Sequence, residues 1–203
     1  MCRVDAELRD GVSVADARLT CMGHMDDLLA RTRRGEKVKY LRFWGHRPLP
    51  DGRVGASCLS QWWPSPFEVD GVRYATAEHW MMAGKARLFG DAEAEERAVA
   101  AKGPAQAKKA GRLVRGFDEA IWERERYALV VAGNVHKFGH DPRLREFLLG
   151  TGERVLVEAS PVDRIWGIGL AADDARAQDP AAWRGLNLLG FALMDARTAL
   201  RAG

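Results

Sequence analysis

The chain has 203 residues, of which 47% are hydrophobic and 29% are charged, and this composition is typical of a soluble globular domain with a sizeable core. Its formal net charge of +3, from 31 basic and 28 acidic residues, is too small to indicate nucleic-acid binding by charge alone. No apolar run approaches the roughly 20 residues that cross a bilayer, and the N-terminus lacks the apolar stretch of a signal peptide. We therefore expect no membrane partner.

Cysteine and histidine spacing gives no sign of a metal. The three cysteines, Cys2, Cys21 and Cys58, are odd in number and form no CxxC pair, and the five histidines show no metal-ligand spacing. Neither a disulfide framework nor a zinc site is indicated. We expect a cytoplasmic protein that uses no metal and no cofactor.

The first residues lack a clear pattern. Residues 1–36 show no sustained apolar period, so we expect a poorly ordered extension there, with Met25 as an alternative start. The domain proper is expected over residues 37–203, and it opens with alternating side chains at 38–44 that predict a strand.

Basic residues cluster in two places. Seven Lys or Arg lie in the segment Arg31–Arg47 and only Glu36 opposes them, while a second group runs from Lys102 to Arg115. Either group could hold phosphates, which leaves nucleic acid open as a partner of the Arg31–Arg47 segment. For either group alone, a solvated surface is the simpler explanation.

Two adjacent tryptophans precede a pair of prolines in residues 59–67, LSQWWPSPF, and the prolines exclude a regular helix. Neighbouring side chains of an extended chain point opposite ways, so one of Trp62 and Trp63 can enter the core while the other lines a cleft. An exposed indole face suits stacking on a planar base. The alternative is that both are core anchors.

A hairpin and a short helix follow. Asp70-Gly71 predicts a type I′ turn that pairs Phe67 with Tyr74, and the helix opens at Thr76. Within that helix, Glu78 and Lys85 are seven residues apart, so they share a face at about 10 Å along the axis. A sugar-sized substrate fits that gap. The structural alternative is that Glu78 caps the helix and Lys85 is solvated.

The remaining chain is mainly helical. Caps, prolines and apolar spacing predict helices at 91–101, 104–115, from 119 to 131 or beyond, at 142–150 and at 186–202, with a buried strand at 154–158. The strands appear few, short and mostly local. This pattern predicts one compact, helix-rich α+β domain.

Polar groups and glycines follow the buried strand. The segment 160–169 contains Asp163, an acceptor or acid, Trp166, a flat platform, and two glycines that allow close backbone approach. Asn187 stands in an apolar setting further on, where it either orders a sugar hydroxyl or, more simply, caps the last helix.

Four segments together resemble, in this order, the YbiA-like or NADAR family: LSQWWPSPF (59–67), YATAEHWMMAGKA (74–86), ASPVDRIWGIGL (159–170) and GLNLLGFALMDAR (185–197). The resemblance spans about residues 40–201 and implies the YbiA-like fold and the activity of an N-glycosidase. By motif, it implies catalytic roles for Glu78, Lys85 and Asp163. It also implies substrate contacts for Ser60, Trp62, Trp166, Gly167 and Asn187.

The implied reaction breaks the bond between a (phospho)ribose or ADP-ribose and a base or amine, with early intermediates of riboflavin biosynthesis among the family's substrates. Two alternatives remain open: an ADP-ribosyl hydrolase acting on guanine in nucleic acid, and a non-catalytic module that binds ADP-ribose or a nucleotide. The chain departs from the family at Gln61, where Asn is usual, and at residues 81–84, where relatives are rich in Gln. Both departures leave substrate choice open.

Local chemistry suggests roles for the helix residues. Glu78 lies near a helix N-terminus, which favours its ionised form, so we expect a carboxylate that stabilises a cationic sugar rather than a general acid. Asp163 would then hold a hydroxyl or move a proton. Lys85 has apolar neighbours that favour the neutral amine, which can form a Schiff base with a ring-opened ribose.

Overall fold

The computed structural model describes residues 14–203, with side chains described from residue 23 onward. Its helices are α1 (Val14–Arg33), α2 (Ala77–Leu88), α3 (Ala92–Val99), α4 (Pro104–Arg112), α5 (Glu119–His140), α6 (Pro142–Gly150) and α7 (Leu188–Ala202). Its strands are β1 (Tyr40–Phe43), β2 (Phe67–Val69), β3 (Val72–Tyr74) and β4 (Val155–Glu158). This is the helix-rich α+β domain that the sequence predicts.

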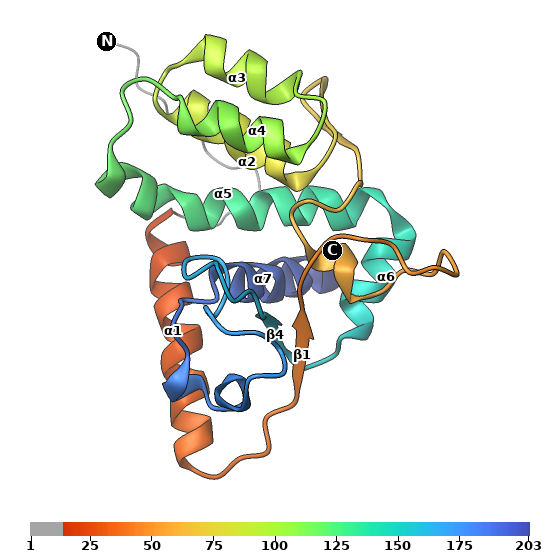
Figure 1. Cartoon of the computed structure of the whole chain (residues 1–203), viewed down its shortest axis with the longest axis vertical. Coiled ribbons are helices and arrows are strands. Elements are labelled where there is room, and N and C mark those ends of the chain that lie inside the picture. Colours follow the sequence, from red (N-terminus) through yellow and green to blue (C-terminus); the bar gives the residue numbers. More distant parts are fainter. Residues whose placement is uncertain (1–13) are drawn as a thin grey trace.

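The elements stack in layers along the long axis (Figure 1). Helices α2, α3 and α4 gather at one end, α5 crosses the middle, and α7 lies beneath it beside β4. The core runs through these layers, with Phe138 of α5, Leu156 of β4 and Phe191 of α7 at most 1% exposed. The site described below lies where the helical end meets the loops around β1 and β4.

Local signals place the helix ends correctly. Asp91, Asp118 and Asp141 each accept a backbone N–H at the start of α3, α5 and α6. Proline occupies the first turn of α4 and α6, where its missing N–H costs nothing. The predicted helices are therefore confirmed, with ends shifted by at most a few residues except in α5, which continues to His140.

The hairpin has the predicted register. Phe67 pairs with Tyr74, Glu68 with Arg73 and Val69 with Val72. Asp70 and Gly71 take φ values of 51° and 76°, the left-handed conformation that a type I′ turn requires. The hairpin leads directly into α2, so the turn helps to fix where Glu78 lies.

The expectation that strands pair mostly locally is wrong for β1 and β4. These strands are parallel neighbours, with Tyr40 opposite Val155 and Phe43 opposite Glu158. Their pairing joins segments more than a hundred residues apart, and such a contact leaves no local pattern in the sequence. Both strands end at the same edge, and Glu158 is the last residue of β4.

The N-terminal expectation is also partly wrong. Residues 14–33, within the range expected to be poorly ordered, form α1, which packs against α5 and α7. Leu28 is 2% exposed in the core, and His24 lies 2.6 Å from Asp195 of α7. Weak amphipathic patterning hid this helix, because tertiary contacts rather than local periodicity hold it. Residues 1–13 lie outside the described residues.

Candidate active site

The start of α2 is tied to the tryptophan-containing loop. Glu78 donates its backbone N–H to the carbonyl oxygen of Gln61 at 3.0 Å. The Glu78 side chain is 3% exposed, and its Oε1 accepts no hydrogen bond from the described residues. A buried acceptor with no partner is unusual in a folded protein and indicates a ligand or a reactive role.

Burial dominates the ionisation of Glu78. It raises the pKa of Glu78 to about 7, although Lys108 and a hydrogen bond with the Trp62 side chain act in the opposite direction. Glu78 is therefore less readily ionised than its position at the helix N-terminus predicts. The helix dipole contributes at most about 1 kcal/mol at a surface position, and removing the carboxylate from water costs more.

The two tryptophans separate as predicted. Trp63 is 9% exposed and belongs to the core, whereas Trp62 is half-buried with its ring 5.5 Å from that of His46. The Lys108 ammonium lies 5.9 Å from the centre of the Trp62 ring, so this indole is bordered by a cation and by the Glu78 carboxyl group. Trp62 is thus the flat surface of the site.

A buried lysine that the sequence reasoning missed supports this loop. Lys137 of α5 is 1% exposed, and its Nζ donates to the carbonyl oxygens of Cys58 at 2.6 Å and Ser60 at 2.8 Å. Burial lowers the pKa of Lys137 to about 7. Ser60 has a local role too, because its Oγ accepts the N–H of Trp62 at 3.2 Å. Both contacts hold the backbone that carries Trp62.

Glu158 is the other missed residue. It lies at the carboxyl end of β4, and its Oε2 is buried without a hydrogen-bond partner among the described residues. Burial, then Asp163 and Glu78, raise the pKa of Glu158 to about 8, while Lys108 lowers it. Glu158 therefore belongs to one electrostatic cluster with Glu78, Asp163 and Lys108. A strand-final Glu next to a Ser-Pro turn was the only available signal.

Asp163 shapes the loop after β4. Its Oδ1 accepts the backbone N–H groups of Ile165 at 2.9 Å and Trp166 at 2.7 Å, and its own N–H donates to Ser160 Oγ at 3.2 Å. Oδ2 accepts no hydrogen bond from the part of the chain that the structure describes, so it is available to a ligand. The structure thus brings Asp163 to Glu78, as expected, and packs the half-buried Trp166 against the core.

The structure gives Gly167 and Asn187 different roles from those expected. A Cβ on Gly167 would lie 2.8 Å from the carbonyl oxygen of Glu158, so its closest neighbour is protein backbone rather than a ligand. The Asn187 amide donates to Leu156 O at 2.9 Å and accepts Glu158 N–H at 3.0 Å. Asn187 occupies the N-cap position of α7, but its side chain makes no capping bond. Both residues position β4.

Lys85 lies apart from this cluster. Its Nζ is 3.9 Å from the centre of the Phe117 ring and 5.3 Å from that of Trp122, near the connection between α4 and α5. Burial lowers the pKa of Lys85, as expected from its apolar neighbours, while Glu119 raises it. Among the described residues, no contact between Lys85 and the Glu78 carboxyl group is found.

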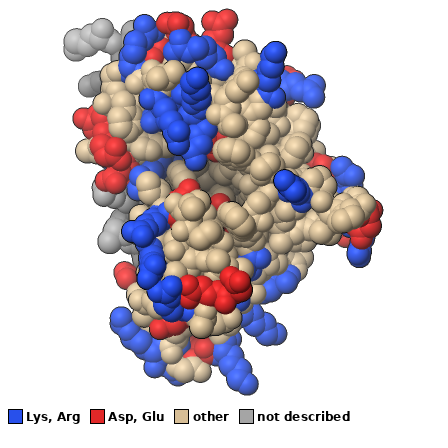
Figure 2. Space-filling view, viewed as in Figure 1, with Lys and Arg blue, Asp and Glu red and all other residues tan. Residues whose placement is uncertain are grey.

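Basic side chains gather beside a hollow on one face of the molecule (Figure 2). Figure 2 shows a hollow near the middle of one face, and Lys and Arg side chains gather above it over α4. That helix contributes Lys108, Lys109 and Arg112 and contains no acidic residue. Lys108 and Arg112 both act on the charge of Glu78. This side of the site is therefore suited to an anionic part of a ligand.

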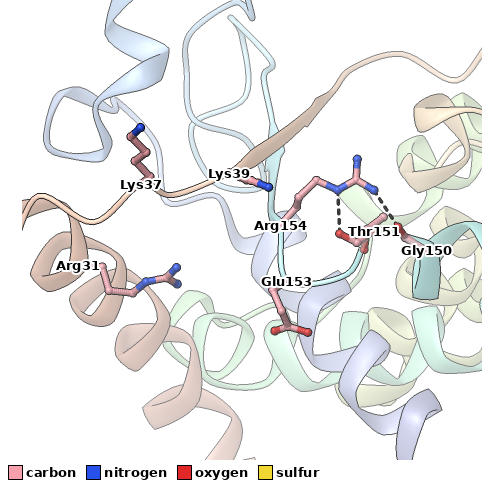
Figure 3. A pocket seen from close by; sticks show the side chains of 7 residues that line it. All are labelled: Arg31, Lys37, Lys39, Gly150, Thr151, Glu153 and Arg154. Carbon is pink, nitrogen blue, oxygen red and sulfur yellow. Dashed lines mark hydrogen bonds between the residues drawn. The ribbon is translucent and has the colours of Figure 1, made fainter.

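A second, basic groove lies at the opposite end of the paired strands (Figure 3). It encloses about 600 Å³ and is lined by Arg31, Lys37, Lys39, Gly150, Thr151, Glu153 and Arg154. Arg31 pairs with Glu36 at 3.2 Å, and Arg154 donates to the carbonyl oxygens of Gly150 and Thr151 at 2.8 Å. These two cations mainly neutralise acidic or carbonyl groups near the ends of α1 and α6.

The fold and the site define a compact α+β domain with buried carboxyl oxygens beside an aromatic surface, and perturbed carboxyl groups of this kind cluster in the active sites of enzymes. The chain belongs to the NADAR family, whose domain model matches residues 42–201. The family predicted from the four motifs is thereby confirmed.

Individual relatives agree with this assignment. The chain is 40% identical to N-glycosidase R617 of Acanthamoeba polyphaga mimivirus, over 80% of this chain and 96% of the relative. It is 32% identical to the riboflavin biosynthesis protein PYRR of Zea mays, over 64% of this chain but 20% of that protein. The solved structure of Escherichia coli YbiA superposes with a TM-score of 0.65 at 25% identity, covering 82% of this chain and 87% of YbiA.

The comparisons confirm the predicted fold and place the chain among proteins named N-glycosidases, as the motifs indicated. No helix of the described residues is both long enough and apolar enough to span a bilayer.

Proposed function

We propose that this protein hydrolyses the bond between C1 of a ribosyl group and the nitrogen of a base or amine. The observation that carries the proposal is the pair of carboxyl groups, Glu78 from α2 and Glu158 from β4, each with a buried oxygen that lacks a partner among the described residues. Cleavage of an N-glycosidic bond passes through a cationic sugar, and adjacent carboxyl groups are suited to stabilise it and to move protons.

The surrounding residues suggest how the substrate lies. The Trp62 indole offers a stacking surface for the base, and Asp163 Oδ2 is free to accept a sugar hydroxyl. Lys108 and Arg112 supply positive charge next to Glu78, which favours a sugar that carries phosphate. We assign Gly167 and Asn187 to holding β4 in place rather than to binding the substrate.

For the substrate, we favour a phosphoribosylated aminopyrimidine of riboflavin synthesis, with the maize relative as support. ADP-ribose on guanine in nucleic acid is the second candidate, because exposed Lys109 and Arg112 could contact further phosphates. A non-catalytic module that binds ADP-ribose is the third. The carboxyl pair favours catalysis over simple binding of an anion, since two acidic groups repel an anionic ligand.

A substrate panel tests the reaction. The protein is incubated with aminopyrimidine ribotides, ADP-ribosylated guanosine and NAD, and mass spectrometry identifies which one loses its base. Glu78→Gln should lower kcat by about 100-fold or more while substrate binding persists. Glu68→Gln, at an exposed position of β2, is the matched control and should keep full activity. Turnover of no substrate by the wild type would favour the binding module.

A covalent route through Lys85 is a separate proposal. Burial lowers the pKa of its amine, which favours the neutral form that attacks a ring-opened ribose, and the amine lies over two aromatic rings apart from the Glu78 cluster. Borohydride added during turnover should then trap a sugar adduct on Lys85. Absence of the adduct, with Lys85→Ala still active, would remove Lys85 from the chemistry.

A further inference from the structure

The backbone of Glu158 is fixed by contacts with three other segments. Glu158 pairs with Phe43 of β1, its N–H donates to Asn187 Oδ1 at 3.0 Å, and its carbonyl oxygen accepts the N–H of Ile168 at 2.9 Å. A side chain on such a backbone has a well-defined origin, which is what proton transfer to a bound substrate requires. The neighbouring polar contacts therefore serve the position of this carboxyl group.

The charges that face Glu158 come from three elements. Asp163 lies in the following loop, Glu78 in α2 and Lys108 in α4. Two of these groups are acidic and one is basic, and Oε2 of Glu158 is buried without a partner among the described residues. Two nearby carboxyl groups in a buried site cannot both ionise readily, so the pair holds a proton at neutral pH.

The proton belongs mainly to Glu158. Lys108, the Trp62 side chain and Arg112 all favour the ionised form of Glu78, whereas Lys108 alone does so for Glu158. Burial raises the pKa of both groups, and the contacts that oppose this rise lie mostly around Glu78. One member of the pair is thus prepared as a carboxylate and the other as a carboxylic acid.

We propose that Glu158 is the general acid of the reaction and protonates the departing nitrogen, while the Glu78 carboxylate stabilises the sugar. This inference rests on the proposed function. As the bond between C1 and nitrogen breaks, its electron pair stays on nitrogen and takes the proton of Glu158. Water then adds through its oxygen to C1 and loses one proton to the carboxylate pair. The pair ends with the single proton with which it began.

The test uses leaving groups that differ in their need for a proton. The wild type and Glu158→Gln are assayed on the ribosylamine substrate and on the matching 4-nitrophenyl riboside, whose phenolate leaves unprotonated. Glu158→Gln should lower kcat about 100-fold or more on the ribosylamine and less than about 10-fold on the nitrophenyl compound. Glu78→Gln should lower kcat on both substrates. Glu158→Gln should also lose the fall of kcat at alkaline pH that the wild type shows.

The outcomes separate the two proposals. Equal losses of Glu158→Gln on both substrates, or unchanged activity on both, would overturn the role of Glu158 alone. A wild type that cleaves neither compound would overturn the glycosidase itself. Glu158→Asp keeps an acid and should recover part of the fall of kcat at alkaline pH, which a merely structural role would not explain. Glu153→Gln, in the exposed turn that precedes β4, should behave as wild type on both substrates.

Discussion

Three ionisable side chains lie around the loop that carries Trp62: Glu78 and Lys137 are buried, and Glu158 is half-buried. Burial disfavours the charged state of each group, so the pKa values of the two glutamates are raised and that of Lys137 is lowered. Groups of this kind reduce the stability of a fold and persist where they have a task. Lys137 has an evident one in holding two carbonyl oxygens, and for the two glutamates we propose a role in the reaction.

Glu158 should make the protein less stable as the pH rises from about 5 to about 8. Its folded-state pKa of about 8 exceeds the ordinary value of 4.5, so the folded protein binds the extra proton and stability falls as pH rises through this window. Glu158→Gln should therefore unfold at a higher urea concentration than wild type. The difference in the free energy of unfolding should grow from pH 5 to pH 8 and reach on the order of 2 kcal/mol. Glu153→Gln is the control, and parallel pH dependences for wild type and Glu158→Gln would contradict the prediction.

Lys137 should control the geometry of the tryptophan loop. Lys137→Met removes the donor of two hydrogen bonds, so the carbonyl oxygen of Cys58 loses the Lys137 ammonium and that of Ser60 keeps only the N–H of Trp63. We expect a loss of about 1–3 kcal/mol in the free energy of unfolding and a raised KM, because Trp62 is no longer held. Urea titration and steady-state kinetics measure both effects. A stable variant with unchanged KM would show that the loop holds itself.

At the scale of elements, the start of α7 packs unusually tightly on β4. A Cβ on Gly190 would collide with the carbonyl oxygen of Leu156 and with the Asn187 side chain, the same amide that binds the backbone of Glu158. Only a glycine lets α7 approach this closely. The first turn of α7 thereby fixes the position of β4 and of the Glu158 backbone.

Gly190→Ala should accordingly cost about 2–3 kcal/mol of stability and lower kcat, since β4 has to shift. The matched variant is Gly23→Ala in α1, where nothing lies within 4 Å of the added methyl group. That substitution should stabilise the protein by about 0.5–1 kcal/mol through helix propensity. Thermal melts and kinetics of the two variants, measured side by side, test whether packing decides the sign. Equal changes in stability for Gly190→Ala and Gly23→Ala would contradict this dependence on packing.

The sequence predicted elements whose causes are local. Caps, first-turn prolines and the Asp-Gly turn lie within a few residues of what they determine, and the hairpin register follows from them. Non-local causes were out of reach. Nothing near Glu158 reveals that β1 pairs with β4, or that Asn187 bonds to its backbone. The ionisation of Glu78 was misjudged for the same reason, because burial is a property of the assembled fold.

At the scale of the molecule, α1 closes one side of the core. His24 bonds to Asp195 at 2.6 Å and stacks on Phe191, and Tyr127 of α5 donates to the same Asp195 at 2.6 Å. The helix therefore joins α5 and α7 through one carboxylate, even though the family model begins only at residue 42.

A chain that starts at Met25 should fold less stably. It lacks His24 and the first turns of α1, so we expect a loss of about 1–3 kcal/mol and a correspondingly lower Tm. A chain that starts at residue 14 retains the whole helix and is the control. Calorimetry of both proteins measures the difference. Identical melting temperatures would show that Met25 suffices as a start.

The parallel pairing of β1 with β4 also determines the order in which parts of the fold can form. The two strands lie at positions 40–43 and 155–158, and helices α2 to α6 come between them. During synthesis the first strand must wait for most of the polypeptide to emerge before its neighbour exists, and closing so long a loop is slow. A nascent chain thus has no assembled reaction centre, and refolding experiments should show helical signal returning well before catalytic turnover.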